Sequence, residues 1–473
     1  MSEDSSMLWG GRFAEGPSAD MLRLTASIEV DMALLECDAR ATKAHARVLV
    51  AAGLLDEADL GPIDMTLDTL VEQWRANELS PGPADEDVHS LVERELTERL
   101  GELGARIHAG RSRNDLVAQD FRLWCREAAD DLLDGLSGLL TTIAGRAEEH
   151  ANTLMPGFTH LQPAQPVSVG FHLLAHGFAL ARDIDRLSAA RDAADVGVLG
   201  AGALAGTTLP LDATIGAREL GCKGLFDNAM DAVSDRDFAC DLVYATAMLG
   251  VHLSRMAEEI VMWTSPLLGF ARLPDEWSTG SSMMPQKRNP DMAELVRGRA
   301  AGPIGELTSL LTLLKGLPLA YARDLQEDKA FVFRAVERAR GCLEGMTAMV
   351  ARLTFDESRL ASAAELGGSW ATDVAELLVA RGLPFRAAHE VAGRLVAEVE
   401  VSGGELDAEV LDSHHELLRG SDLDQLTAEK SVMMRSSVGG PAPRRVEQQL
   451  MILRTKAALL RSVEATSGND ESP

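Results

Sequence analysis

The chain has 473 residues, which is enough for two or three domains, and 46% of them are apolar while only 4% are aromatic. Its formal net charge of −28 at pH 7 argues against a protein that binds nucleic acid or an anionic membrane surface, because both partners are themselves negative. The sequence has no run of about 18 apolar residues that could span a membrane, and its first residues lack the basic and apolar regions of a secretory signal.

Residues 1–110 are predicted to form an N-terminal helical domain. An irregular arm occupies residues 1–16, with Trp9 and Phe13 as its strong apolar anchors. Apolar side chains then recur at the helical period, and polar residues predict a break near Ser27. The helices predicted from this period cover residues 18–53, residues 55–77 and a segment that begins at about Asp85.

Residues 111–355 are predicted to form a central domain of long helices. The helical period holds from about residue 114 to 150, which corresponds to a helix of roughly 50 Å. Helices of this length belong to bundles or coiled coils. A loop with three prolines is expected over residues 155–168. The other helices of this domain are predicted at about residues 169–195, 232–268, 290–316 and 324–353.

The helical pattern shortens after residue 355. Residues 356–473 are therefore predicted to form a small C-terminal helical domain, with a tail that is disordered by composition from about Thr466. Extended β-patterns are scarce along the whole chain. The predicted fold class is mainly α, with three domains and a central bundle of long helices.

Four polar segments interrupt the apolar helices, and each lies at the end of a long helix. Helix ends carry unpaired N–H groups that suit carboxylate ligands. A long helix keeps its ends tens of ångströms apart, so a homo-oligomer of bundles brings such segments together more easily than one chain does. The four segments are GRSRND at 110–115, GFTHLQ at 157–162, STGSSMMPQKRNPD at 278–291 and YARDLQEDK at 321–329.

The most specific of these segments is 278–291. It has few bulky apolar side chains and reads as a mobile loop that presents Ser281, Lys287 and Asn289 to a ligand, although composition alone equally fits a solvated polar loop. Its GSS-x-x-P-x-K-x-N spacing resembles the signature of the fumarase/aspartase superfamily, and its MPQK-x-NPD resembles the argininosuccinate lyase family. The resemblance continues in WGGRF at 9–13, DEDVH at 85–89, HAGRSRND at 108–115, PGFTHLQ at 156–162, GALAGT at 202–207, SDRDF at 234–238 and RDLQEDK at 323–329.

This resemblance implies an elimination in which argininosuccinate is cleaved reversibly to arginine and fumarate. It also implies a homotetramer around a large helix bundle, with each active site drawn from three subunits. Neither a metal nor an organic cofactor is expected, and we find no ligand set with metal spacing in the sequence. The five scattered cysteines, without a C-x-x-C pair, favour reduced thiols in a cytoplasmic protein.

The resemblance assigns the catalytic roles to a few residues. Ser281 transfers a proton, and Lys287 could stabilise its alkoxide. A lone histidine such as His160 is usually structural, but its THLQ segment matches the family, in which Glu294 would be the partner that orients it. Lys287 with Asn289 would stabilise the doubly negative carboxyl group of the intermediate. Which of Ser281 and His160 takes the first proton stays open.

The resemblance also implies a set of substrate contacts. Arg113 is a further candidate, since a guanidinium matches a carboxylate with two hydrogen bonds, and Asp87 is a candidate partner for the guanidinium end of the substrate. Leu116 and Ala322 stand where the family usually has Gln and Asn, which leaves the fine positioning of the substrate open. The contacts implied by the family are Ser27, Asn114, Thr159, Tyr321, Gln326 and Lys329.

Two other functions stay open. Another fumarate-forming lyase, for adenylosuccinate or aspartate, would carry the same superfamily signature. A non-catalytic protein on the same fold, like the lens crystallins related to this family, would have no turnover. The presence of Ser281, His160, Lys287 and Asp87 argues against the non-catalytic alternative.

Overall fold

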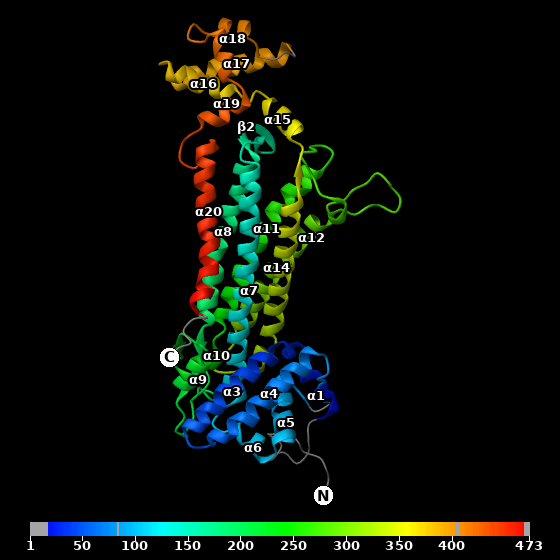
Figure 1. Cartoon of the computed structure of the whole chain (residues 1–473), viewed down its shortest axis with the longest axis vertical. Helices are drawn as coiled ribbons and strands as arrows, with labels where there is room; N and C mark the ends of the chain where they lie inside the picture. Colours follow the sequence, from blue (N-terminus) through cyan, green and yellow to red (C-terminus); the bar gives the residue numbers. More distant parts are fainter. Residues whose placement is uncertain (1–17, 83–84, 403–405, 468–473) are drawn as a thin grey trace. The chain divides into compact units, whose positions relative to one another are not determined.

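The computed structural model describes residues 18–82, 85–402 and 406–467 (Figure 1). Helices dominate these residues, and the paired strands among them form three two-stranded sheets. The prediction of a mainly α fold built on long helices is confirmed. The predicted arm at 1–16, with Trp9 and Phe13, lies outside the described residues. The tail was predicted to begin at about Thr466, and the last helix continues to Ser467, where the described residues end. Across the described part of the chain, none of the helices is long and apolar enough to cross a membrane.

The chain divides into two compact units, each assembled from three separate stretches of sequence. The first unit takes residues up to 132, 185–248 and 301–339, and the second takes residues 133–184, 249–300 and those from 340 onward. The predicted domain boundaries at residues 110 and 355 stay a prediction.

The N-terminal helices of the first unit pack around an apolar core. These helices are α1 (Ala19–Thr25), α2 (Ile28–Asp31), α3 (Leu35–Ala51), α4 (Leu60–Arg75), α5 (Val88–Leu100) and α6 (Glu102–Arg106). In Figure 1, α3, α4 and α5 lie side by side, and Leu49, Leu67 and Leu91 are among the side chains in their shared core. The break predicted near Ser27 is confirmed, because Ser27 separates α1 from α2.

The long helices follow the helical period of the sequence closely. They are α7 (Arg113–Glu149), α8 (Val169–Ala194), α11 (Asp237–Thr264), α12 (Asp291–Arg299), α13 (Ala301–Leu314) and α14 (Asp328–Arg352). The 37 residues of α7 correspond to about 55 Å. The single helix predicted over 290–316 is wrong, since α12 ends before Ala300 and α13 follows. Pro303 explains the interruption, because it has no N–H to donate to the carbonyl of Arg299.

Short elements complete the first unit. They are β3 (Val196–Gly197), α9 (Ala213–Glu219), β4 (Gly224–Leu225), α10 (Ala229–Ser234) and the 3-10 turn η5 (Arg323–Gln326). Strands β3 and β4 pair in parallel. Helix α9 packs against α3. These elements therefore hold the segment that follows α8 against the N-terminal helices.

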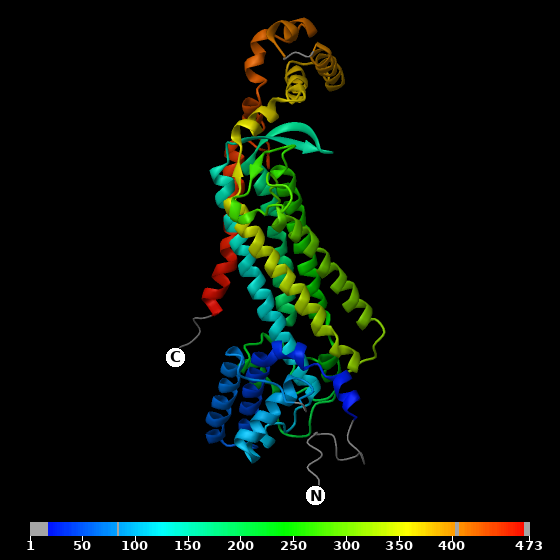
Figure 2. The same ribbon diagram turned by 90° about the vertical axis from the view of Figure 1, so that its right-hand side faces the viewer.

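The proline-containing loop predicted over 155–168 is instead a β-hairpin, β1 (Leu154–Thr159) and β2 (Gln162–Ser168), which Figure 2 shows in teal. Its turn is made by His160 and Leu161, both at positive φ, 56° and 58°. Positive φ at both central residues defines the two-residue turn whose twist matches that of paired strands. A hairpin alone has no central strand, so its prolines do not interrupt a sheet.

The second unit ends in short helices and one long one. These elements are β5 (Ala271–Arg272), β6 (Thr354–Phe355), α15 (Glu357–Glu365), α16 (Ala371–Ala380), α17 (Phe385–Ser402), α18 (Ala408–His414), α19 (Ala428–Met434) and α20 (Pro443–Ser467). Val374, Leu395 and Leu411 are in a core of their own. α20 contacts the second-unit part of α7, where Ser137 Oγ donates to the carbonyl of Ala457 at 3.2 Å.

Candidate active site

One cavity of about 330 Å³ in the first unit is lined by seven of the residues predicted from the sequence. Helix ends create this cavity: Ser27 lies between α1 and α2, Asp87 caps α5, and α7 begins at Arg113. The other side comes from η5 and the first turn of α14. The seven residues are Ser27, Asp87, Arg113, Asn114, Tyr321, Gln326 and Lys329.

Five further charged or titratable side chains line the same cavity, and sequence reasoning missed them. Four of them lie inside segments that carried the family resemblance, and those segments could have pointed to them. The fifth, Asp31, has no such motif, and its only signal was its place in the polar break between the first two helices. The five residues are Asp31, Glu86, His89, His108 and Arg323. Leu116 and Ala322, the two departures from the family pattern, are not among the lining residues.

Cations and carboxylates alternate around the cavity. Arg113 Nη1 donates to Asp87 Oδ2 at 3.1 Å and lies 3.9 Å from Glu86 Oε2. Arg323 pairs with the same Glu86 and donates to the carbonyl of Thr25 at 2.9 Å. A cavity with paired charges of both signs can exchange these internal partners for the charges of a ligand.

Lys329 is the most buried cation of the cavity, with 3% of its side chain exposed. Its Nζ donates to Asp328 Oδ1 at 3.0 Å and to the carbonyl of Leu325 at 3.3 Å. Asp328 also accepts from the fully buried Arg236 at 2.5 Å. The lysine is thus held in place by a buried network rather than by solvent.

Two carboxyl groups of the cavity differ in their environment. Burial alone would raise the pKa of Asp87, but the charges of His89 and Arg113 and the hydrogen bonds from Ser90 hold it below its usual value. Burial raises the pKa of Asp31, against the opposing effects of Lys329 and the Ser27 hydroxyl. Asp87 is therefore a fixed negative charge that can face a guanidinium.

A buried group stands behind His89. Its Nδ1 lies 2.6 Å from Asp38 Oδ2 and 3.4 Å from Asp120 Oδ2, and all three side chains are at most 3% exposed. Burial, followed by the charge of Asp38, raises the pKa of Asp120 well above its ordinary value. The hydrogen bond with Asp38 fixes the orientation of the imidazole that lines the cavity.

Thr159 and His160 lie at the tip of the hairpin in the second unit, where both are exposed. Asn, Asp or Gly is the ordinary choice at positive φ, and non-glycine residues there carry a backbone cost of about 1–3 kcal/mol each. The turn instead has His160 and the bulky Leu161, whose side chain is 69% exposed. Strain of this kind is typical of functional sites, which agrees with the predicted role of His160.

The 278–291 loop lies in the same unit and is closed at its base. Thr279 and Asn289 exchange both backbone hydrogen bonds, at 3.1 and 2.8 Å. Ser281 Oγ accepts the backbone N–H groups of Met283 and Met284 at 3.3 and 3.2 Å. Because the oxygen accepts, the hydroxyl hydrogen remains available to a base.

Lys287 and Asn289 line a second cavity, of about 890 Å³, at the base of this loop. Glu294 lies on the exposed side of α12, one turn after the loop. Within the described part of the chain, no hydrogen bond or ion pair joins Glu294 to His160. Their pairing therefore stays a prediction.

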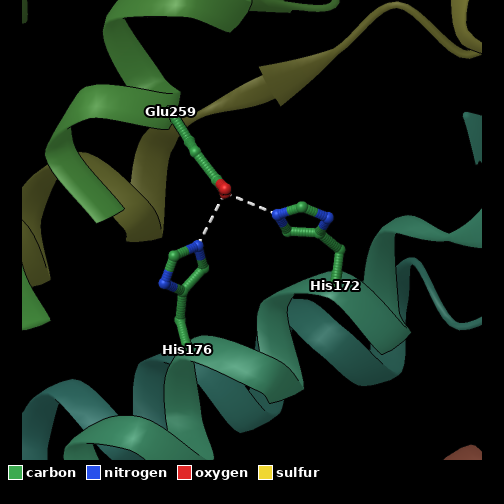
Figure 3. A group of neighbouring side chains, drawn as sticks. All are labelled: His172, His176 and Glu259. Atoms are coloured by element: carbon green, nitrogen blue, oxygen red, sulfur yellow. Dashed lines mark hydrogen bonds and ion pairs between the residues drawn. The ribbon is translucent and has the colours of Figure 1, made fainter. Parts of the chain in front are cut away.

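Among the residues that the structure describes, two groups of side chains could each hold a metal ion, with ligand atoms within 4.8 Å of one another. One is the buried group of Asp38, His89 and Asp120 described above. The other, in the second unit, has His172, His176 and Glu259, which point toward one another in Figure 3. The sequence reasoning missed this second group, and its signal was the H-x-x-x-H spacing on α8.

Comparison with known proteins decides the family. A protein-family model described as lyase matches residues 11–305 of the sequence. A second family model, described as argininosuccinate lyase C-terminal, matches residues 368–433. An argininosuccinate lyase of Acidothermus cellulolyticus is 48% identical over 464 residues, which are 97% of this chain and 95% of the relative. The chain belongs to the argininosuccinate lyase family. Another relative, an argininosuccinate lyase of Frankia casuarinae, is 49% identical over 94% of this chain and 97% of its own.

Solved structures agree with this family assignment at the level of the fold. An EDDS lyase variant with bound fumarate has a TM-score of 0.82 at 24% identity, over 97% of this chain and 93% of that one. A class II fumarase from Schistosoma mansoni has a TM-score of 0.74 at 16% identity, over 88% of this chain and 93% of the fumarase chain. The argininosuccinate lyase family and its C–N lyase activity are the ones predicted from the 278–291 segment, so that prediction is confirmed.

Proposed function

We propose that this protein cleaves argininosuccinate reversibly to arginine and fumarate, a reaction of arginine biosynthesis. The observation that carries the proposal is the 48% identity to an argininosuccinate lyase over nearly the full length of both chains. The cavity of the first unit supports it. Argininosuccinate has carboxylates, an amino group and a guanidinium, and the cavity offers Arg113, Arg323 and Lys329 beside Glu86 and Asp87.

The proposed reaction needs one base and one acid. The base removes a proton from the carbon next to a carboxylate, the freed electron pair forms the C=C bond of fumarate, and the C–N bond breaks. The acid then protonates the guanidinium nitrogen that leaves. Ser281 and His160 take these two roles, and Glu294 orients His160. Lys287 and Asn289 stabilise the doubly negative carboxyl group of the intermediate.

Substrate binding is proposed for residues of both units. In the first unit, Asp87 faces the guanidinium, and Arg113 and Lys329 face carboxylates. In the second, Thr159 at the hairpin tip donates its hydroxyl to a carboxylate. Hydrogen-bond partners in the cavity come from Ser27, Asn114, Tyr321 and Gln326.

We propose a homotetramer whose active sites are shared between subunits. Arg113 begins α7, and the hairpin with Thr159 and His160 follows the end of the same helix. A helix of this length separates its two ends by about 55 Å, far more than a substrate can bridge. The exposure of the hairpin tip and of the 278–291 loop also supports sites completed by another subunit.

The proposed elimination uses side chains as acid, base and cation, so neither a metal nor an organic cofactor takes part in it. The five cysteines are all free, which supports the proposal of a cytoplasmic enzyme. The proposed partners are the substrate, its two products and further copies of the chain, without nucleic acid or membrane.

The test is to offer argininosuccinate, adenylosuccinate and aspartate separately and to follow the ultraviolet absorbance of fumarate. Turnover with argininosuccinate alone is expected. Fumarate from one of the other two compounds instead would replace the proposed substrate. A folded oligomer without turnover on any of them would favour a non-catalytic, crystallin-like role.

A further inference from the structure

Two histidines on α8 and one glutamate on α11 form a group outside the proposed catalytic set. His172 and His176 are four residues apart, so they lie one turn apart on the same face of the helix. Both direct Nε2 at a single oxygen, Oε2 of Glu259, at 2.5 and 2.7 Å (Figure 3). The three ligand atoms belong to one compact unit and converge on one point.

The surroundings leave this group accessible but well oriented. The side chains of His172, His176 and Glu259 are 22%, 13% and 34% exposed, so water and small ions can reach them. The ring of His172 meets the edge of Trp263 at a centroid distance of 5.2 Å, which limits its rotation. Preoriented imidazoles lose little freedom when they bind a ligand.

We propose that His172, His176 and Glu259 bind a divalent transition-metal ion of the Zn²⁺ class, which links α8 to α11. Two imidazoles and one carboxylate are a ligand set that Zn²⁺ and related ions favour, whereas Mg²⁺ and Ca²⁺ prefer oxygen ligands throughout. Three protein ligands leave a fourth position for water. The ion has no part in the proposed elimination.

The group needs only a small adjustment to hold such an ion. Ligand atoms about 2.0–2.2 Å from a tetrahedral zinc ion lie about 3.3–3.6 Å from one another. The two contacts of Glu259 at 2.5 and 2.7 Å would therefore widen by about 0.6–1.1 Å. Glu259 has three rotatable side-chain bonds and is one-third exposed, so it can move this far. The chain's net charge of −28 also raises the local concentration of cations.

The alternative is a carboxylate that simply accepts two imidazole N–H groups, and the two arrangements make opposite predictions. Protein freed of metal with a chelator is titrated with Zn²⁺ in a calorimeter, and its melting temperature is measured with and without Zn²⁺. The metal site predicts saturable binding of one ion per chain and a higher melting temperature. A simple hydrogen-bonded carboxylate predicts neither.

Two variants and one control locate the ion. Glu259→Gln keeps an acceptor oxygen for the histidines but removes the charged ligand, and His176→Ala removes one imidazole. Each should weaken Zn²⁺ binding by more than about 10²-fold, because even the loss of an outer-shell partner costs 10–100-fold. His389→Ala, on the exposed side of α17, should bind like the unchanged protein.

The proposal is overturned by two results. One is the absence of saturable Zn²⁺ binding by the metal-free protein. The other is unchanged affinity in both variants, which would place the ion elsewhere, for example at Asp38, His89 and Asp120. Circular dichroism and turnover measured without metal check that the variants fold. Glu259→Gln should keep the native circular dichroism spectrum and the turnover of the unchanged protein, because Glu259 lies outside the proposed catalytic residues.

Discussion

At the scale of single residues, Ser281 is held by its own loop rather than by a neighbouring base. Its oxygen accepts two backbone N–H groups, and this position leaves its hydrogen free to be transferred. We expect Ser281→Ala to fold and bind substrate while kcat falls by at least about 10²–10⁴-fold. Steady-state rates, circular dichroism and substrate binding measure this, and Ser282→Ala is the matched control. Near-native kcat in the variant would remove Ser281 from the mechanism.

His160 offers a second test, because its backbone conformation and its chemistry can be separated. Asn is among the residues best tolerated at positive φ, so His160→Asn should keep the hairpin and its melting temperature while kcat falls. Glu294→Gln should also lower kcat, but by less, since the proposed role of Glu294 is to orient the imidazole without reacting. Leu161→Asn is the control that changes the turn alone. A fully active Glu294→Gln would break the proposed pair.

His45 predicts how stability depends on pH. It is 3% exposed on α3, and its Nε2 donates to the carbonyl of Ala109 at 3.0 Å. Burial, followed by the charge of Arg111, lowers the pKa of His45 to about 3. Below its unfolded pKa of about 6.5 the unfolded chain binds a proton that the folded chain does not, so stability falls as pH falls, by up to about 1.4 kcal/mol per pH unit.

His45→Gln removes this titration and keeps a donor for the same carbonyl. Between pH 6.5 and 5 the variant should therefore lose up to about 2 kcal/mol less stability than the unchanged protein. Urea unfolding at pH 7 and pH 5, at one protein concentration, measures the difference. His389→Gln, an exposed histidine, should keep the original pH dependence. Equal pH slopes for all three proteins would contradict the prediction.

Not every residue of the candidate site could be predicted from the sequence. Asn114 and Lys329 lie inside recognisable motifs. Their presence in one site could be predicted from the family resemblance, but not from their spacing in the sequence. Asp38 and Asp120 carry no motif of their own and look like ordinary polar positions on apolar helices. Their role depends on packing against His89, which no local pattern encodes.

At the scale of elements, Asp115 ties the start of α7 to the glycine-rich segment that follows α8. Its Oδ1 accepts from the N–H of Ser112 at 2.9 Å, and its Oδ2 accepts from Gly200 and Gly202 at 3.1 and 2.9 Å. Gly200 and Gly202 have φ of 101° and 60°, which lets both N–H groups point at one oxygen. Burial raises the pKa of Asp115 to about 6 despite these donors, so the group is ionised at pH 7.

Asp115→Asn should therefore lower the free energy of unfolding by about 2–4 kcal/mol, because an amide has one acceptor oxygen and leaves buried N–H groups without a partner. Denaturant unfolding at fixed protein concentration measures this. Asp134→Asn, on the exposed face of the same helix, is the control and should change stability by less than about 0.5 kcal/mol. A similar loss in both variants would show that Asp115 has no special structural role.

The long helices were predictable because their period extends over many turns, as in α7 and α11. The hairpin was not, because the prolines of residues 155–168 mask its pairing, and its turn uses His160 and Leu161 in place of the usual Asn-Gly. The interruption between α12 and α13 was missed because the apolar period continues across it while Pro303 removes one hydrogen bond.

At the scale of the whole molecule, the proposed sharing of active sites would make activity a property of the assembly. If His160 and Ser281 of one site come from different subunits, two inactive variants should rescue each other. His160→Asn and Ser281→Ala are unfolded together, refolded and assayed. A site then works only where its His160 comes from a Ser281→Ala chain and its Ser281 comes from a His160→Asn chain. Random mixing of equal amounts gives this combination in roughly one quarter of sites.

A site built from one subunit predicts no rescue at any ratio, since every chain carries one substitution. Each variant refolded alone is the control. Native mass spectrometry confirms that mixed oligomers have formed. Mixed oligomers without recovered activity would contradict the shared site and the argument from the length of α7.

The two-residue turn at His160 and Leu161 also restricts how this part of the chain can change in length. Surface loops commonly tolerate insertions and deletions. In this hairpin, one residue more or less would shift the pairing of β1 with β2, and a shift of one position moves every following side chain to the opposite face. Met155, now buried, would turn outward, and the tip would no longer present Thr159 and His160 together. Descendants of this sequence can therefore vary Leu161, but they must keep the number of residues in the turn.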